Sequence, residues 1–335
     1  MTTRRGFVIG AAAAAGCATA TPPGPSLGGV RRISPALDAL IAPDATIEQL
    51  GSGFQWTEGP LWDRAKKRLF FTDVPGNTLY QWCSKYGVRE VLKPSGFAGA
   101  DASHLREGGA NGLAFEAGGA LLMCDTGNRT VARLDLGTMQ KTVLAERFDG
   151  MRFNSPNDLV VARTGAIYFT DPPFGLAGMS DSPLRETPFH GVYRLTPDGA
   201  VTVIERELMF PNGIAFSPDQ SLLYVSGRDG QRPLIKVYAM GADGLPSSSR
   251  EFFDMAPMQG EGRLGSPDGM KVDAAGNLFA TGPGGVMVIT PAGEALGVIN
   301  TGGRISNCAF GEDGRTLFVT AHDKLGRIRT RTRGY

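Results

Sequence analysis

Residues 212–226 read NGIAFSPDQSLLYVS. Ile214 and Phe216 alternate with smaller residues and predict a short strand, and Leu222–Val225 predict a second strand after a turn. The stretch is therefore predicted to form a β-hairpin that begins at a polar residue, Asn212.

The same pattern occurs six times along the chain. The copies are EGPLWDRAKKRLFFTD from Glu58, NGLAFEAGGALLMCD from Asn111, NDLVVARTGAIYFTD from Asn157, NGIAFSPDQSLLYVS from Asn212, DGMKVDAAGNLFATG from Asp268 and SNCAFGEDGRTLFVT from Ser306. Successive copies start 53, 46, 55, 56 and 38 residues apart. Further strand-like runs lie between copies, such as Leu234–Tyr238 and Arg250–Phe253, so each unit holds four antiparallel strands.

Four-stranded units at this interval are typical of propeller blades. The sequence thus predicts an all-β fold, a six-bladed β-propeller with four antiparallel strands per blade, over residues 44–325. A hairpin alone cannot bury its apolar faces, so the blades must stack and the ring must close. We expect Thr46–Phe54 to add a strand to the last blade and so join the two ends of the domain.

The composition agrees with a turn-rich globular domain. The 335 residues include 47 glycines and 22 prolines, more loop punctuation than a helical bundle tolerates. Basic and acidic residues number 34 and 33, a balance that offers no footprint for nucleic acid or an anionic membrane surface. We therefore expect a small-molecule partner, and a solvated basic tail over residues 326–335.

The N-terminus resembles an export signal. Residues 1–20 hold a pair of arginines at positions 4 and 5, an apolar run over Val8–Ala15 too short to span a bilayer, and small residues around Cys17. Such a segment predicts export by the twin-arginine translocation machinery, to the periplasm or the medium. Two processing outcomes stay open: a lipid anchor at Cys17, or cleavage after Ala20.

Between this segment and the repeats, residues 21–43 are rich in proline, glycine and alanine and are interpreted as a tether. Removal of the first 20 residues leaves Cys83, Cys124 and Cys308 without CxxC spacing, so no disulfide framework is predicted. Cys124 and Cys308 lie in predicted strands, where a free cysteine usually packs as a small buried residue.

The opening residue of each copy has a special place in a propeller. The first strand of a blade lies beside the axis, so these residues converge on one mouth of the central tunnel. They are Glu58, Asn111, Asn157, Asn212, Asp268 and Ser306, and each offers a side-chain oxygen. The alternative interpretation is ordinary turn chemistry, for which the same residue types are suited.

Two carboxylates and several amides on one axis would repel each other or remain unsatisfied without a cation or ordered water. We therefore expect one bound divalent cation. Because the ligands are all oxygens, a hard ion is favoured over a structural Zn²⁺. Ca²⁺ is the first choice, and Mg²⁺, Mn²⁺ or Zn²⁺ are the alternatives.

Several motifs at these positions together resemble one known family. They are TEGPLW, ANGLAF, SPNDLVV with IYFTDPPFGL, FPNGIAFSPD, SPDGMKVDAAGNLFATGPGGV and NCAFGEDGRTLFVTA, within residues 48–324. The chain is similar to the family of regucalcin (senescence marker protein 30), gluconolactonases and luciferin-regenerating enzymes, and most of all to bacterial gluconolactonases.

The resemblance implies a six-bladed propeller that hydrolyses sugar lactones or other esters and, in some relatives, organophosphates. It also implies one catalytic divalent cation. By the matching motifs, its ligands would be Glu58, Asn157, Asn212 and Asp268.

Opening a lactone requires a polarised carbonyl, an activated water and stabilisation of the oxyanion. A cation supplies the first and the last, and because Ca²⁺ activates water weakly we expect a carboxylate base, Asp268. For contacts to substrate hydroxyls we expect Asp171, at the end of a second strand, then Asn111, and His104 from the loop 94–110. Turn chemistry or a surface position is the alternative for these residues.

Loops 94–110, 175–190 and 255–266 are expected to reach the same mouth and to shape a lid. Other function classes remain open at this point. One is a metal-dependent esterase or organophosphate hydrolase, and another is an exported propeller without enzymatic activity that binds a small molecule or a protein through this face.

Overall fold

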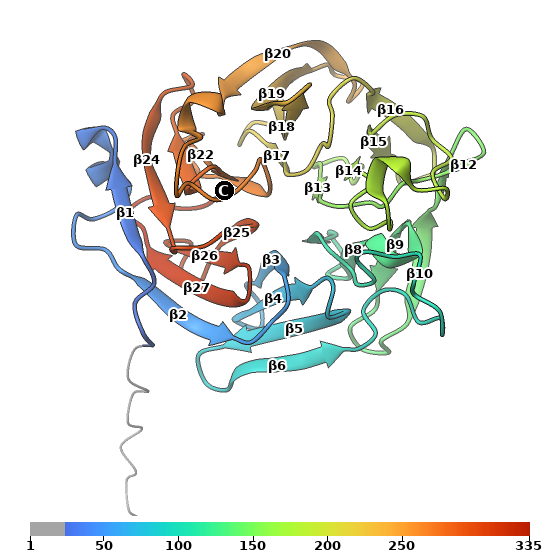
Figure 1. Cartoon of the computed structure of the whole chain (residues 1–335), viewed down its shortest axis with the longest axis horizontal. Helices are drawn as coiled ribbons and strands as arrows, with labels where there is room; N and C mark the ends of the chain where they lie inside the picture. Colours follow the sequence, from blue (N-terminus) through green and yellow to red (C-terminus); the bar gives the residue numbers. More distant parts are fainter. Residues whose placement is uncertain (1–23) are drawn as a thin grey trace, which may run out of the picture.

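Six antiparallel sheets surround a central axis in the structure, a computed structural model that describes residues 24–335 (Figure 1). The first three blades are β3 (Thr57–Asp63), β4 (Arg68–Asp73), β5 (Thr78–Cys83) and β6 (Gly87–Leu92); β7 (Leu113–Phe115), β8 (Leu121–Asp125), β9 (Thr130–Leu134) and β10 (Lys141–Ala145); and β13 (Leu159–Val161), β14 (Ile167–Asp171), β15 (Gly191–Leu195) and β16 (Val201–Glu205). The predicted six-bladed propeller is confirmed.

The last three blades complete the ring. They are β17 (Ile214–Phe216), β18 (Leu222–Asp229), β19 (Arg232–Met240) and β20 (Pro246–Asp254); β21 (Met270–Val272), β22 (Leu278–Gly282), β23 (Gly285–Ile289) and β24 (Ala295–Asn300); and β25 (Asn307–Gly311), β26 (Thr316–Ala321) and β27 (Lys324–Arg329) with β2 (Ile47–Ser52). A two-stranded ribbon and short 3₁₀ turns complete the described elements: β11 (Arg147–Phe148), β12 (Met151–Arg152), η1 (Pro35–Ala39), η2 (Thr126–Asn128), η3 (Met179–Asp181) and η4 (Ala256–Met258).

The ring closes through an N-terminal strand. β2 lies outermost in the last blade and pairs with β27, with Ile47 opposite Ile328. The expectation that Thr46–Phe54 supplies this strand is confirmed. Because the partners come from opposite ends of the domain, the pairing fastens the ring and leaves no open junction between the first and last blades.

The structure corrects the expected tether. β1 (Gly29–Arg32) pairs with β24 and makes the fifth blade five-stranded, and η1 follows it. Leu37 and Ile41 are fully buried, and a Cβ at Gly297 would overlap the Leu37 side chain. The proline-rich composition concealed two apolar anchors, so the part of 21–43 that the structure describes belongs largely to the propeller.

The basic tail that the sequence predicts over residues 326–335 also needs correction, because its first residues belong to a strand. β27 runs to Arg329, and Arg327 bonds Glu48 (2.8 Å) and Glu312 (2.7 Å). Residues 326–329 are therefore part of a blade. Alternating arginines on a half-exposed strand have the same sequence pattern as a solvated charge run.

Hydroxyl groups on the second strands tie neighbouring blades together at the axis. Four of them donate to the backbone carbonyl of the opening residue in the next blade: Thr72 to Asn111 (3.1 Å), Thr170 to Asn212 (2.7 Å), Ser226 to Asp268 (2.8 Å) and Thr281 to Ser306 (3.0 Å). Ser306 Oγ donates to the Thr57 carbonyl (2.5 Å) and joins the last blade to the first. These bonds fix the inner strands relative to one another.

The apolar core lies between blades. In one cluster Leu122 and Val131 of the second blade pack against Phe169 and Tyr193 of the third, and the rings of Phe169 and Tyr193 stack with centroids 5.3 Å apart. Cys124 and Cys308 are buried and Cys83 is half-buried, and all three thiols are free. No helix within residues 24–335 has the length and apolar character needed to cross a bilayer. The expected export signal, lipid anchor and cleavage site lie outside the described residues.

Candidate active site

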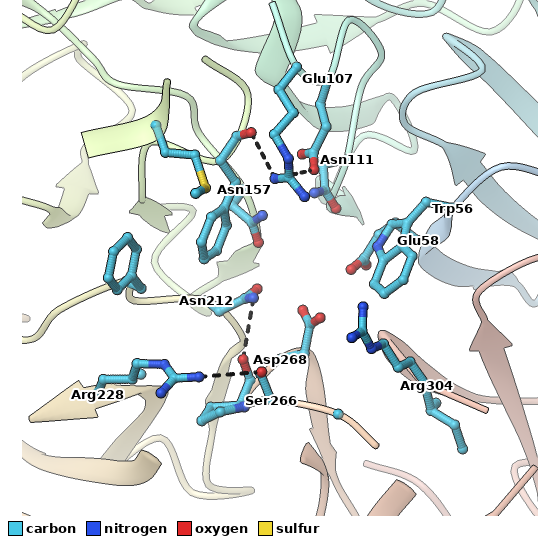
Figure 2. Close-up of a pocket in the computed structure, with 18 of the residues that line it drawn as sticks. Trp56, Glu58, Glu107, Asn111, Asn157, Asn212, Arg228, Ser266, Asp268 and Arg304 are labelled. Atoms are coloured by element: carbon cyan, nitrogen blue, oxygen red, sulfur yellow. Dashed lines mark hydrogen bonds and ion pairs between the residues drawn. The ribbon is translucent and has the colours of Figure 1, made fainter. Parts of the chain in front are cut away.

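Five of the six opening residues line one cavity at a mouth of the tunnel, with a volume of about 450 Å³. They are Glu58, Asn111, Asn157, Asn212 and Asp268, from five different blades. Figure 2 shows the two carboxylates and the amides of Asn157 and Asn212 directed toward the same central space. The predicted convergence is present. The sixth position, Ser306, is fully buried and engaged in the ring-closing bonds instead.

Glu58 is held by its own strand and by the last blade. Its Oε2 accepts the backbone N–H of Gly59 (3.0 Å) and a side-chain N–H of Asn307 (3.2 Å). Gly59 has φ +50°, and a Cβ there would overlap the Asn111 carbonyl oxygen. The glycine in TEGPLW is therefore required for the close approach of the first two blades.

Asn307 is a site residue that the sequence did not reveal. It follows Ser306 in the sixth copy, one place beyond the repeated position. Its side chain lies against Gly269, where any Cβ would overlap it, and also reaches within 3.5 Å of Asp158. The doublet Ser306-Asn307 was the available signal, because only the second residue of the pair has a long polar side chain.

Glu58 and Asp268 form the floor of the cavity, and burial together with nearby negative charge raises the pKa of each. Burial raises the pKa of Glu58, and the negative charge of Asp158 raises it further. Burial, followed by the charge of Glu58, raises the pKa of Asp268 well above its ordinary value. The two carboxylates therefore resist being ionised together unless positive charge lies between them.

The amides supply further oxygens. Asn111 Oδ1 is buried without a hydrogen-bond partner, and Asn212 donates its Nδ2 to the Pro267 carbonyl (3.4 Å). An orphaned buried oxygen beside two repelling carboxylates is the arrangement that a hard cation satisfies. Within residues 24–335 no cluster of three or more histidine, cysteine, aspartate or glutamate side chains suits a metal, so a cation here depends on amide oxygens.

Aromatic side chains form the cavity walls. Trp56 lines the cavity together with Phe174 and Phe210, whose rings stack with centroids 5.7 Å apart. The backbone N–H of Phe210 donates to Nδ1 of His190 (3.1 Å), so His190 anchors this wall from behind. Flat apolar walls with a few polar groups are typical of small-ligand sites.

The loop 94–110 contributes a pair that the sequence did not single out. Glu107 lines the cavity, and burial raises its pKa to about 7. Arg106 Nη1 lies 2.9 Å from Glu107 Oε1. His104, the residue expected to contact substrate from this loop, does not line the cavity; its ring packs edge-on against Phe97 with centroids 5.3 Å apart.

Asp171 also lies outside the cavity. It is fully buried, and its carboxylate accepts the backbone N–H groups of Asn154 (2.7 Å) and Ser155 (2.8 Å). The expectation that it contacts substrate hydroxyls is corrected: it fixes the segment that delivers Asn157. The turn-chemistry interpretation describes this residue correctly, because a strand-end carboxylate is well placed to cap backbone N–H groups. Of the three expected substrate contacts, the structure places Asn111 alone in the cavity.

Comparisons with known proteins agree with this architecture. A profile described as the SMP-30/Gluconolactonase/LRE-like region matches residues 56–323. A gluconolactonase of Zymomonas mobilis is 43% identical over 321 residues, covering 93% of this chain and 88% of the relative. A pentonolactonase, XacC, of Haloferax volcanii is 27% identical over 272 residues, covering 78% and 80%.

Among solved structures, the gluconolactonase XC5397 of Xanthomonas campestris superposes with a TM-score of 0.78 at 35% identity, covering 92% of this chain and 99% of that one. The profile covers most of the chain, including every opening residue of the repeats. The chain belongs to the SMP-30/gluconolactonase/LRE-like family, as its motifs predicted.

Proposed function

We propose that this protein opens sugar lactones by hydrolysis at the mouth of the propeller. The observation that carries the proposal is the convergence of Glu58 and Asp268 with three asparagine amides in one aromatic-walled cavity. Relatives that cover most of the chain are named gluconolactonase and pentonolactonase, and they support a lactonase, a hydrolase of carboxylic esters.

The site suits one divalent cation. Glu58, Asn157, Asn212 and Asp268 would hold it, since they offer two carboxylates and two amides to the same space. When bound, a cation such as Ca²⁺ would supply a Lewis acid for the carbonyl and lower the pKa of a nearby water. The rise that the charge of Glu58 causes in the pKa of Asp268, and the unpaired oxygen of Asn111, support this assignment.

The residues of the chain account for the proton transfers. Asp268 takes a proton from water as the water oxygen bonds to the carbonyl carbon of the lactone. The tetrahedral species then breaks its ring C–O bond, and the protonated Asp268 returns the proton to the departing alkoxide. The product is an open hydroxy acid. Its place beside Glu58 in the cavity lets the Asp268 carboxylate hold the proton between these steps.

The remaining lining residues orient the substrate. The faces of Trp56, Phe174 and Phe210 offer apolar surface to the C–H faces of a sugar ring. Asn111 retains a free acceptor for a substrate hydroxyl or for the cation. Esters and phosphotriesters remain competing substrates because the same base and ion would serve them.

The test is a pH-stat assay of purified protein on aldonolactones, aryl esters and phosphotriesters, with and without chelator, followed by re-addition of Ca²⁺, Mg²⁺, Mn²⁺ or Zn²⁺. We expect lactone hydrolysis that chelator abolishes and one ion restores. Activity on phosphotriesters but not lactones would replace the proposed substrate class. Binding of lactone without turnover would favour a non-enzymatic role.

We also propose export by the twin-arginine route, with Cys17 lipidation or cleavage after Ala20 as the two outcomes. The supporting observation is the order of charged, apolar and small residues over 1–20. Replacement of both arginines by lysine should leave the protein in the cytoplasm on cell fractionation. Unchanged export would contradict the route.

A further inference from the structure

We propose that the preferred substrates are lactones that carry a negatively charged group remote from the ester, and that Arg228 and Arg304 hold this group at the rim of the cavity. The inference rests on the proposed lactonase function and adds the charge of the substrate to it. The shared chemistry is an oxyanion, either a carboxylate or a phosphate.

Arg304 lies in the connection from β24 to β25 and lines the cavity. Figure 2 shows its guanidinium directed into the cavity on the side of Glu58 and Asp268. The neighbouring Ile305 is buried and fixes the backbone, while the Arg304 side chain is exposed. No carboxylate of residues 24–335 lies within ion-pair distance of it.

Arg228 reaches the rim because one strand is unusually long. β18 continues three residues beyond Ser226, and Arg228 lies on this extension. Its backbone pairs in both directions with Met209 (2.9 and 2.8 Å), which makes the extension rigid. The side chain donates to the Gln231 carbonyl (3.1 Å) and to Ser266 Oγ (3.4 Å), with no carboxylate of the described chain as partner.

Arg106 provides the internal comparison. It lines the same cavity, but its charge is balanced by Glu107 at 2.9 Å, and it also donates to the Phe174 carbonyl (3.1 Å). Arg228 and Arg304 therefore differ from it in keeping uncompensated charge beside the opening. A neutral sugar offers only hydroxyl groups to such charges, whereas an oxyanion accepts charge-assisted hydrogen bonds from guanidinium groups.

The carboxylates at the floor of the cavity and the arginines at its rim would contact different ends of the substrate. Glu58 and Asp268 would be engaged with the cation and the reacting ester, so a substituent remote from the ester would extend away from them toward the opening of the cavity. The free guanidinium groups lie at the rim, where such a substituent would emerge. The ester would then lie at the floor beside the base, which is the orientation that hydrolysis requires.

The experiment compares matched lactone pairs on the metal-loaded full chain. D-glucaro-1,4-lactone carries a carboxylate where D-glucono-1,4-lactone has a hydroxymethyl group, and 6-phospho-D-glucono-1,5-lactone is paired with D-glucono-1,5-lactone. We expect kcat/KM for the carboxylate or the phosphate probe to exceed that of its neutral partner by about tenfold or more, from one or two charge-assisted hydrogen bonds. The substrate pair with the larger ratio of anionic to neutral kcat/KM shows whether the oxyanion is a carboxylate or a phosphate.

Arg228→Gln, Arg304→Gln and the double variant should each lower this ratio, mainly through KM, and rising salt should lower it for the wild type. Arg64→Gln removes an equal charge at the opposite mouth and should leave the ratio unchanged. Two results would overturn this inference alone. One is hydrolysis of the neutral lactones with no higher kcat/KM for the anionic ones. The other is an equal loss of kcat/KM for both lactones of a pair in the arginine variants. Failure to hydrolyse any lactone would instead overturn the proposed function.

Discussion

Glu58 lies on the first blade and is also held by a residue of the last blade, Asn307. One of its oxygens is occupied by Gly59 and Asn307, which leaves the other for the cavity. We predict that Glu58→Gln loses metal, because an amide oxygen carries no charge to balance a cation. Metal analysis after dialysis measures this, with Glu116→Gln as the control, because Glu116 is a half-buried carboxylate outside the cavity. Full metal retention in Glu58→Gln would remove Glu58 from the ligand set.

Asn307 should act through Glu58. Replacement by alanine removes the hydrogen bond to Glu58 Oε2 and leaves Glu58 and Asp158 without their shared donor. Groups that orient a ligand usually contribute about 10–100-fold to metal affinity or activity. We therefore expect Asn307→Ala to lower metal affinity by about tenfold, measured by calorimetric titration. An unchanged affinity would reduce Asn307 to a packing role.

Prediction from the sequence was strongest where a residue occupied a repeated position. Glu58 and Asp268 were found because six copies could be aligned and the axis gathers their first residues. Asn307 stands one place beyond the aligned polar position, where most copies have glycine, and Glu107 lies in a loop outside the repeat, so the alignment of opening residues pointed to neither. Asp171 was misjudged because a strand-end aspartate has the same sequence signature whether it caps backbone N–H groups or faces a ligand.

At the scale of elements, β1 and η1 add a segment outside the repeats to the fifth blade. Leu37 is its fully buried anchor. Leu37→Ala should lower the free energy of unfolding by about 2–5 kcal/mol through lost burial and a residual cavity. Urea unfolding monitored by tryptophan fluorescence measures the change. Leu264→Ala, at an exposed leucine, is the control and should change it by less than about 0.5 kcal/mol. If Leu37→Ala and Leu264→Ala change the free energy of unfolding by equally small amounts, the segment around Leu37 is a tether after all.

Glu205 joins the third blade to the fourth. Its Oε2 accepts hydrogen bonds from Lys236 Nζ and Tyr238 Oη, both at 2.6 Å. Burial alone would raise its pKa, but these bonds outweigh burial and lower the pKa to about 2. The group therefore stabilises the fold above its unfolded pKa of about 4.5, and this contribution is lost as pH falls toward 2.

Glu205→Gln should consequently destabilise the protein at pH 7, by about 1–3 kcal/mol. The difference from the wild type should shrink between pH 4.5 and pH 2. Thermal unfolding of both proteins across this range measures it. A difference that stays constant with pH would mean that the charge of Glu205 contributes nothing.

At the scale of the whole molecule, ring closure creates the site. β2 fastens to β27, Ser306 bonds to Thr57, and five opening residues then face one cavity. The periodicity predicted this closure because each hairpin needs neighbours to bury its faces. The connections between blades were less predictable: their lengths vary, and features such as Arg304 and the extension of β18 follow from no repeat.

We propose that the carboxylate of Asp268, at the mouth of the ring, is the base that drives lactone hydrolysis. The most direct test of this proposal is the pH-stat rate of D-glucono-1,5-lactone opening, above the spontaneous rate, for wild type and Asp268→Asn at equal, measured metal occupancy. We expect a loss in kcat of about 10²–10⁴-fold, the usual contribution of a general base. A near-normal kcat with a full complement of metal would contradict it.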